Sequence, residues 1–300
     1  MPELPELLAL LRSQRWLLLL GCPGSGKSWT ARQLAREAIA QENYQQSYAQ
    51  LSVPEQDLLD HFSGPVRRAQ LHPAWSYELF IEGLRPEMVQ GQASSVLRDG
   101  VFKRFCRDAS ARPKQSWSLI LDDVHRCEIG HIFGESQQLL EAPDDRVWLP
   151  ASGDSLQLTR RAMLIATSQR RDLARLDPAW LRHFAVVELQ PDYTVLPKLA
   201  MGARMFSPGA WLSELNARLS RLLGPLAVGE WLGQGYFFHD GRPPTDFAAW
   251  QQRLRYQIWP HLQQLSQQFG FSLQDLIGTV DPASPALPQD LEAEFPQAFE

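Results

Sequence analysis

The sequence predicts an α/β fold in which a mainly parallel sheet, flanked by helices, precedes a small helical domain. Short apolar segments typical of strands alternate with helix-like segments from residue 16 to about 190. A glycine-rich loop joins the first of these strands to the first long helix. Strand signals stop after about residue 195, where amphipathic helical patterns take over. Together these observations predict the fold class.

Each predicted element follows from its own pattern of apolar residues. The apolar run at 16–20 predicts a buried strand, and the segment WTARQLAREAIA at 29–40 predicts the helix after the loop. Further along the chain the pattern predicts, in order, a strand at 67–72, a helix near 100–111, a strand at 117–121, a helix through 132–142, a hairpin from 146–150 and 155–159, and strands at 161–168 and 184–189.

These patterns divide the chain into two domains and a tail. The α/β domain is predicted at 1–192. Amphipathic helices at 210–224 and 247–270 predict a helical lid domain at 193–280. The last segment, 281–300, holds five acidic residues, four prolines and no basic residue, and we expect it to be disordered.

Composition and charge exclude several classes of protein. The last segment accounts for the net charge of −5, so the rest of the chain is neutral. A neutral body has no general attraction for nucleic acid, so contact with DNA would need local patches. The apolar runs are far shorter than the roughly 20 residues needed to cross a bilayer. Three cysteines without metal or disulfide spacing, and an N-terminus without a signal-peptide pattern, predict a cytoplasmic protein that does not bind membranes.

Residues 21–28 read GCPGSGKS and fit the phosphate-loop pattern G-x-x-x-x-G-K-[ST]. Between a strand and a helix, such a loop directs backbone N–H groups at one point, where glycines allow phosphate oxygens to approach closely. We expect Lys27 to reach the β- and γ-phosphates of a nucleoside triphosphate and the Ser28 hydroxyl to bind Mg²⁺. The predicted nucleotide-binding residues are Gly21, Cys22, Pro23, Gly24, Ser25, Gly26, Lys27, Ser28 and Trp29.

A second chemical signal follows the strand at 117–121, where the apolar run ends in Asp122 and Asp123. In phosphate-loop enzymes, acids at this place hold Mg²⁺ and orient the attacking water. We therefore assign Asp122 to the metal and Asp123 to the water. Thr167 and Ser168 end a later strand-like run, where a polar group can contact the γ-phosphate or the water. A polar strand end that leads into a loop is an equally simple explanation of these two residues.

Arg182 lies in the segment DPAWLRHF, at the end of a short helix before the last predicted strand. In ring-forming NTPases, an arginine at this place can reach the γ-phosphate bound by a neighbouring subunit. We predict this role for Arg182. The alternative is a solvated arginine at a helix end.

These parts, in this order, resemble an AAA+ ATPase module. The stretch LHPAWSYELFIEGLRPE at 71–87 narrows the resemblance to the McrB family, the GTP-dependent motors of McrBC modification-dependent restriction. Further stretches are similar to segments of that family in the same order: GVFKRFC, LILDDVHR, HIFGESQQLLE and RLDPAWLRHFAVVELQPD. The resemblance covers roughly residues 5–270.

The resemblance implies a function as well as a fold. It implies a ring, expected to be a hexamer, that binds GTP or ATP with Mg²⁺ between its subunits. The implied partner is a McrC-like nuclease subunit in an antiviral restriction system, with DNA contacted through that partner or through the ring. The family's larger members carry an N-terminal domain that reads modified DNA, and because the phosphate loop begins close to Met1 we expect this chain to lack one. The residues themselves do not separate GTP from ATP.

Some positions depart from the family's pattern. Asp123 stands where the family has a glutamate, so its side chain is shorter by one methylene, about 1.5 Å. Because a displacement of about 1 Å can lower a rate about 100-fold, slow hydrolysis is a possible outcome. His125 replaces an asparagine, and the family's sensor asparagine is absent, so Thr167 or Ser168 would have to substitute for it.

Two other functions fit the same residues. A nucleotide-gated scaffold that binds but hardly hydrolyses would agree with the departures at Asp123 and Thr167. A MoxR-like remodeller would prefer ATP and would work without a nuclease partner.

Overall fold

The computed structural model describes residues 3–89, 92–201 and 203–299. Packing divides the chain into two units. Of the described residues, the sheet unit contains those at 3–20 and 27–188, and the helical unit contains Gly21–Gly26 and those at 189–299. Among the described residues, no helix has the length and apolar character needed to span a lipid bilayer. The domain limits at 192 and 280 stay predictions.

The sheet unit is built on five parallel strands, which confirms the predicted α/β class. Their order across the sheet is β2-β5-β8-β1-β9. Every residue of β1 and β5 is buried, as their unbroken apolar runs require. The strands span Trp16–Gly21 (β1), Val66–Gln70 (β2), Trp117–Asp122 (β5), Ala162–Gln169 (β8) and Ala185–Leu189 (β9).

Strand register brings polar residues of three strands to one edge of the sheet. Gln70 of β2 pairs with Asp122 of β5, and Leu121 of β5 pairs with Ala166 of β8. One step further along β8 is Thr167, which therefore lies beside Asp122. Because the strands are parallel, their carboxyl ends meet at this edge.

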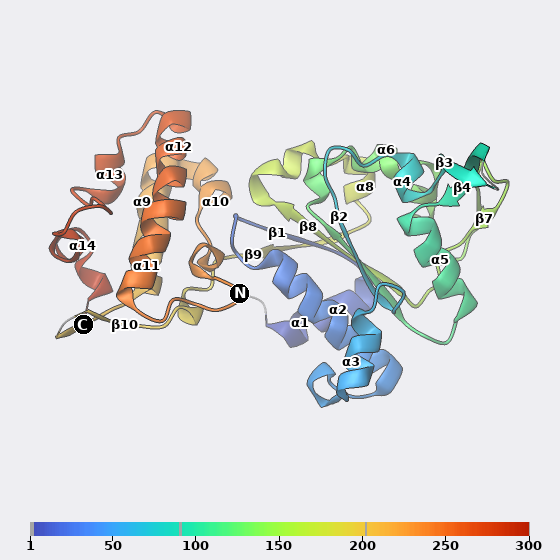
Figure 1. Cartoon of the computed structure of the whole chain (residues 1–300), viewed down its shortest axis with the longest axis horizontal. Coiled ribbons are helices and arrows are strands. Elements are labelled where there is room, and N and C mark those ends of the chain that lie inside the picture. The colour runs from blue at the N-terminus through green and yellow to red at the C-terminus, as the bar shows by residue number, and fades with distance from the viewer. Residues whose placement is uncertain (1–2, 90–91, 202, 300) are drawn as a thin grey trace. The chain divides into compact units, whose positions relative to one another are not determined.

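Helices cover the sheet on both sides, and Figure 1 shows α1, α2 and α3 together on one of them. Helix α2 lies against β5 and β8, and α1 packs on α2. The helices of this unit span Leu4–Gln14 (α1), Lys27–Tyr44 (α2), Val53–Asp60 (α3), Tyr77–Phe80 (α4), Val101–Ala111 (α5), Ile129–Phe133 (α6), Gln138–Glu141 (α7) and Pro178–Leu181 (α8). The predicted helix through 132–142 is interrupted at Gly134, whose φ of 49° suits glycine better than other residues.

A long hairpin between α4 and α5 is not predicted by the sequence pattern. Its strands, β3 (Glu82–Val89) and β4 (Gln92–Asp99), pair antiparallel. The predicted hairpin at 146–159 is present, with short strands β6 (Val147–Trp148) and β7 (Ser155–Leu156).

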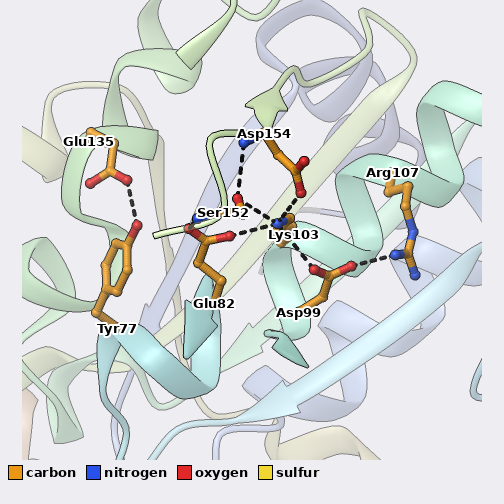
Figure 2. Close-up of polar contacts among 8 residues, drawn as sticks. All are labelled: Tyr77, Glu82, Asp99, Lys103, Arg107, Glu135, Ser152 and Asp154. Atoms are coloured by element: carbon orange, nitrogen blue, oxygen red, sulfur yellow. Dashed lines mark hydrogen bonds and ion pairs between the residues drawn. The ribbon is translucent and has the colours of Figure 1, made fainter. Parts of the chain in front are cut away.

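Lys103 of α5 joins these two hairpins, as Figure 2 shows. Its ammonium group donates to Glu82 at 2.6 Å, to Asp154 at 2.6 Å and to Ser152 at 3.2 Å, and it lies 3.1 Å from Asp99. The Glu82 side chain is completely buried, and its second oxygen accepts from the Ser152 amide at 2.9 Å. The base of the β3–β4 hairpin is therefore fixed by a buried charge cluster.

The helical unit has its own apolar core. It contains a short antiparallel hairpin of β10 (Leu199–Met201) and β11 (Arg204–Phe206), so the prediction that strands end near 195 is wrong here. Its helices, yellow to red in Figure 1, span Pro208–Leu223 (α9), Ala227–Glu230 (α10), Phe247–Arg253 (α11), Trp259–Phe269 (α12), Leu273–Ile277 (α13) and Leu287–Glu294 (α14). A π-helical turn, Leu254–Ile258, joins α11 to α12.

The segment 281–300 is not a disordered tail in the described residues. Helix α14 lies in it, and Leu287, Leu291, Phe295 and Ala298 are buried in the core of the helical unit. Leu287 and Leu291 lie one turn apart on the same face of α14, and Phe295 and Ala298 follow the helix. Acidic residues and prolines dominate the composition of this segment, so composition alone does not reveal that its apolar residues belong to a core. The prediction of disorder is therefore wrong.

Candidate active site

The glycine-rich loop adopts the predicted strand–loop–helix arrangement. Strand β1 ends at Gly21, and α2 begins at Lys27. Gly24 and Gly26 have φ values of 78° and 90°, a left-handed conformation that glycine adopts without strain. Such turns align successive backbone N–H groups around a concavity suited to an anion.

A second glycine segment holds this loop. The Gly233 amide donates to the Pro23 carbonyl at 2.9 Å, and the Gly235 amide donates to the Gly24 carbonyl at 2.8 Å. A Cβ added to Gly233 would lie 2.1 Å from the Gly24 carbonyl carbon, so only glycine fits there. Sequence reasoning missed this segment, although the pair of glycines in GQGYFF was a signal.

The remaining loop residues differ in exposure. Cys22 and Ser25 are buried, and the Ser25 hydroxyl has no hydrogen-bond partner within the described part of the chain. Lys27 is 8% exposed, and Ser28 is half-buried. Trp29 is 64% exposed, so its ring faces solvent. Buried polar groups in the loop suit a ligand that supplies oxygen atoms.

Asp122, Asp123 and Thr167 form a hydrogen-bonded cluster at the carboxyl edge of the sheet. The Thr167 hydroxyl donates to Asp122 Oδ1 at 2.8 Å and accepts from the Asp123 amide at 3.0 Å. Asp122 and Thr167 are completely buried. The structure thus brings together three residues that the sequence singled out on two separate strands.

Two residues of β2 join this cluster and were not predicted. The Arg68 guanidinium donates through Nε to Asp122 Oδ2 at 2.5 Å, and the Gln70 amide donates to Asp123 Oδ2 at 2.8 Å. Arg68 also donates to Gln70 Oε1 at 3.2 Å. No motif marked these residues, because strand pairing across the sheet determines their position.

Ser168 and His125 lie close to Thr167 and Asp123 along the chain, and both are buried. The Ser168 hydroxyl donates to the Gln169 carbonyl at 3.3 Å rather than to Asp122 or Asp123. Burial lowers the pKa of His125; nearby Asp172 and Asp123 oppose this shift, and the positive charge of Lys27 adds to it. Strand β1 lies beside β8 in the parallel sheet, so it leads into the glycine-rich loop at the same edge as this cluster.

Arg182 follows α8 and is exposed at the surface. Its guanidinium donates to Glu141 at 2.7 Å and to the Ala179 carbonyl at 3.3 Å, and its side chain is 60% exposed. The ion pair is therefore solvated and open to exchange with another anion.

The oxygen groups of Asp122 and Ser28 suit Mg²⁺, which prefers oxygen ligands. Within the described ranges, no three His, Cys, Asp or Glu residues are grouped so as to hold a metal ion by themselves. Magnesium commonly has few protein ligands and completes its shell with phosphate oxygens and water. Asp122 and Ser28 therefore fit a weakly held Mg²⁺ ion, whose shell the phosphate oxygens of a nucleotide would complete.

Comparison with known families identifies the architecture. A profile for the AAA domain of the dynein-related subfamily matches residues 16–184, more than half of the chain. The chain belongs to this AAA family. The match begins with β1 and ends immediately before β9, so it covers the loop and the acidic cluster of this AAA chain.

The AAA chain is also similar to a curated protein, the type IV methyl-directed restriction enzyme EcoKMcrB subunit of Escherichia coli (strain K12). The two are 26% identical over 264 residues, which cover 79% of the AAA chain and 51% of the relative. The chain thus spans about half the length of this relative. A crystal structure of a proposed ATPase from Cytophaga hutchinsonii shares 14% identity with a TM-score of 0.35, covering 62% of the AAA chain and 44% of its own. That likeness is too weak to support an argument.

Proposed function

We propose that the chain is an NTP hydrolase of the McrB-like AAA+ type, which uses GTP in preference to ATP. The observation that carries this proposal is the cluster of Asp122, Asp123 and Thr167, at the edge of the sheet where β1 leads into a phosphate loop. Each group suits one part of phosphoryl transfer to water.

The first part is binding. The backbone amides of Gly24, Gly26 and their neighbours would surround the phosphates, and the Lys27 ammonium would neutralise them. Ser28 and Asp122 would hold Mg²⁺, which supplies positive charge at the phosphate oxygens. The positive φ values of Gly24 and Gly26 support this assignment.

The second part is hydrolysis. Asp123 would orient the attacking water, and its carboxylate is already held by Gln70. Thr167 would fix Asp122 and the backbone of Asp123 rather than contact the γ-phosphate, because its hydroxyl already serves both groups. Ser168 is a weaker candidate, since its hydroxyl bonds the local backbone.

The third part is assembly. Arg182 would act on the γ-phosphate of a neighbouring subunit in a ring, here proposed as a hexamer, after leaving Glu141. Its solvated ion pair with Glu141 makes that release inexpensive in free energy.

The likeness to a restriction-enzyme subunit supports a role in cytoplasmic antiviral restriction with a McrC-like nuclease subunit. Direct DNA binding by this chain is proposed to be weak. Three basic residues from clusters in the sequence are paired with acids: Arg107 with Asp99, Arg160 with Asp144, and Arg170 with Glu188. DNA would thus be engaged through the partner or through the assembled ring.

Binding of fluorescent GTP and ATP analogues with Mg²⁺ tests the proposal. Lys27→Ala removes a charged contact with phosphate and should weaken binding by about 10- to 100-fold. Lys114→Ala, which changes an exposed lysine after α5, is the matched control and should bind as the wild type does. Absence of saturable binding by the wild type, or equal binding by Lys27→Ala, would contradict the proposal.

A second candidate is a scaffold that binds nucleotide and hydrolyses it slowly. The short Asp123 side chain and its hydrogen bond to Gln70 favour this function, because both limit its reach toward a water. A rate of nucleotide hydrolysis lower than the rate at which subunits exchange between assemblies would support the scaffold. A clear preference for ATP, without any nuclease partner, would instead support a MoxR-like remodeller.

A further inference from the structure

Asp122 already has a cationic partner. Its side chain is completely buried, and each of its oxygens accepts a hydrogen bond, Oδ1 from Thr167 at 2.8 Å and Oδ2 from Arg68 at 2.5 Å. Because the Arg68 guanidinium is charged, its hydrogen bond to Asp122 is stronger than the neutral one from Thr167. A buried carboxylate without a compensating charge would be costly, so Arg68 stabilises Asp122 in the metal-free protein.

The same carboxylate is the one assigned to Mg²⁺. A guanidinium on Oδ2 occupies a lone pair that a metal or its water would need, and it repels a divalent cation a few ångströms away. Asp122 can therefore bind Mg²⁺ with its full negative charge only if the Arg68 guanidinium moves away. The Arg68 side chain is 40% exposed at the edge strand β2, so its guanidinium can turn toward solvent without unpacking the core.

We propose that Arg68 competes with Mg²⁺ for Asp122 and thereby sets the metal concentration at which the site becomes active. This inference rests on the proposed role of Asp122. Departure of Arg68 also frees Gln70, since Arg68 donates to Gln70 Oε1 and Gln70 donates to Asp123. Metal binding at Asp122 is thus coupled through β2 to the position of Asp123.

The test compares Arg68→Gln with Arg67→Gln. Arg67 is the adjacent residue of β2 and also pairs with a carboxylate, at 2.7 Å, but with that of Asp108 rather than that of Asp122. Two quantities are measured: Mn²⁺ binding to the nucleotide-free protein, from the paramagnetic resonance of free Mn²⁺, and the Mg²⁺ concentration that gives half-maximal binding of a fluorescent nucleotide.

Competition predicts that Arg68→Gln binds Mn²⁺ more tightly and lowers the half-saturating Mg²⁺ concentration by about tenfold or more. Arg67→Gln should match the wild type. Arg68→Lys keeps the positive charge and should stay closer to the wild type than to Arg68→Gln. An unchanged or higher metal requirement in Arg68→Gln would overturn the inference, as would a lysine variant that behaves like the glutamine variant.

Melting temperatures distinguish a folding defect in a variant from a change in its metal binding. Arg68→Gln should melt below the wild type in metal-free buffer, and Mg²⁺ should raise its melting temperature more than that of the wild type. An equal rise in both would count against competition. If the wild type bound neither GTP nor ATP, the proposed function would fail, while the Mn²⁺ measurement on the nucleotide-free protein would still decide the role of Arg68.

Discussion

Asp123 combines a short side chain with an unusual backbone. Its φ of 57° lies in the left-handed region, which aspartate tolerates better than most residues because its side chain bonds locally. Gln70 then fixes the carboxylate from the neighbouring strand. Three constraints therefore set the position of the Asp123 carboxylate: the short side chain, the left-handed backbone and the hydrogen bond from Gln70. A substitution of Asp123 can change the first of these, the length of the side chain.

Asp123→Glu should increase hydrolysis. The added methylene extends the carboxylate by about 1.5 Å, and a gain of about 10- to 100-fold in turnover is expected if reach is the limiting factor. The left-handed backbone should make the variant less stable by about 1 kcal/mol. Phosphate release at saturating nucleotide measures the first effect, and thermal melting the second. A variant that hydrolyses no faster than the wild type would show that reach is not limiting.

At this scale, the sequence was most informative where a motif is continuous along the chain. The loop from Gly21 to Ser28, and the pair Asp122 and Asp123, could be located from the letters alone. Arg68 and Gln70 could not, because they belong to a strand with no motif and meet the acids only through β2–β5 register. A side chain that acts across a sheet leaves no local pattern.

The Lys103 cluster determines the stability of the β3–β4 hairpin at the scale of elements. Burial raises the pKa of Glu82, but hydrogen bonds from Lys103 and Ser152 outweigh it, so the pKa lies below its ordinary value. The folded state therefore binds the proton of Glu82 less readily than the unfolded state does. Stability from this group is present above the ordinary glutamate pKa of about 4.3 and is lost as the pH falls through the lower, folded value.

Glu82→Gln should remove this dependence. At pH 7 the variant is expected to lose about 1–3 kcal/mol of unfolding free energy, because a charged hydrogen bond to Lys103 becomes a neutral one. The difference from the wild type should shrink as the pH falls below about 4. Urea unfolding between pH 3 and pH 7 measures both. Glu87→Gln, on the same strand but paired with Arg98 at the surface, should change little. A gap between Glu82→Gln and the wild type that stays constant with pH would reject this account.

Strands could be predicted from the sequence where both of their faces are buried. Strands β1, β5 and β8 are covered on both faces, so their apolar runs are continuous and easy to recognise. The β3–β4 hairpin is different, since β3 contains Pro86, and exposed Leu84 and Met88 alternate with polar residues. Its anchor, Lys103, lies on a helix and contacts acids distant in sequence. No pattern within β3 could reveal that support.

At the scale of the whole molecule, the C-terminal residues are part of a core. Ending the chain after Ala286 would remove Leu287, Leu291 and Phe295, each fully buried and each contributing about 1.5–3 kcal/mol by burial. Such a loss is comparable with the stability of a typical domain. We expect the truncated chain to lose helical circular dichroism and to become sensitive to protease within residues 208–277. Glu292→Gln, which changes only a surface pair with Arg204, should behave as the wild type does. A truncated chain that melts at the wild-type temperature would refute this prediction.

The proposed assembly into a ring can be tested by a complementation experiment. Arg182→Ala should lower turnover by about 1,000-fold or more while nucleotide affinity stays close to that of the wild type. Arg175→Ala, an exposed arginine paired with Asp172, is the control. Mixing Arg182→Ala with Lys27→Ala should restore part of the activity, because some interfaces then combine an intact loop with an intact arginine. A mixture no more active than its separate components would argue against action in trans.

The two glycines that hold the phosphate loop have a consequence for recognising related chains. Gln234, which lies between them, donates to the Ser25 carbonyl across 209 positions of sequence, and neither neighbouring glycine has room for a methyl group. The tripeptide Gly233–Gly235 therefore behaves as a distant second half of the phosphate-loop signature. A search pattern that required both halves would separate chains with this clasped loop from the many unrelated proteins that share only G-x-x-x-x-G-K-[ST].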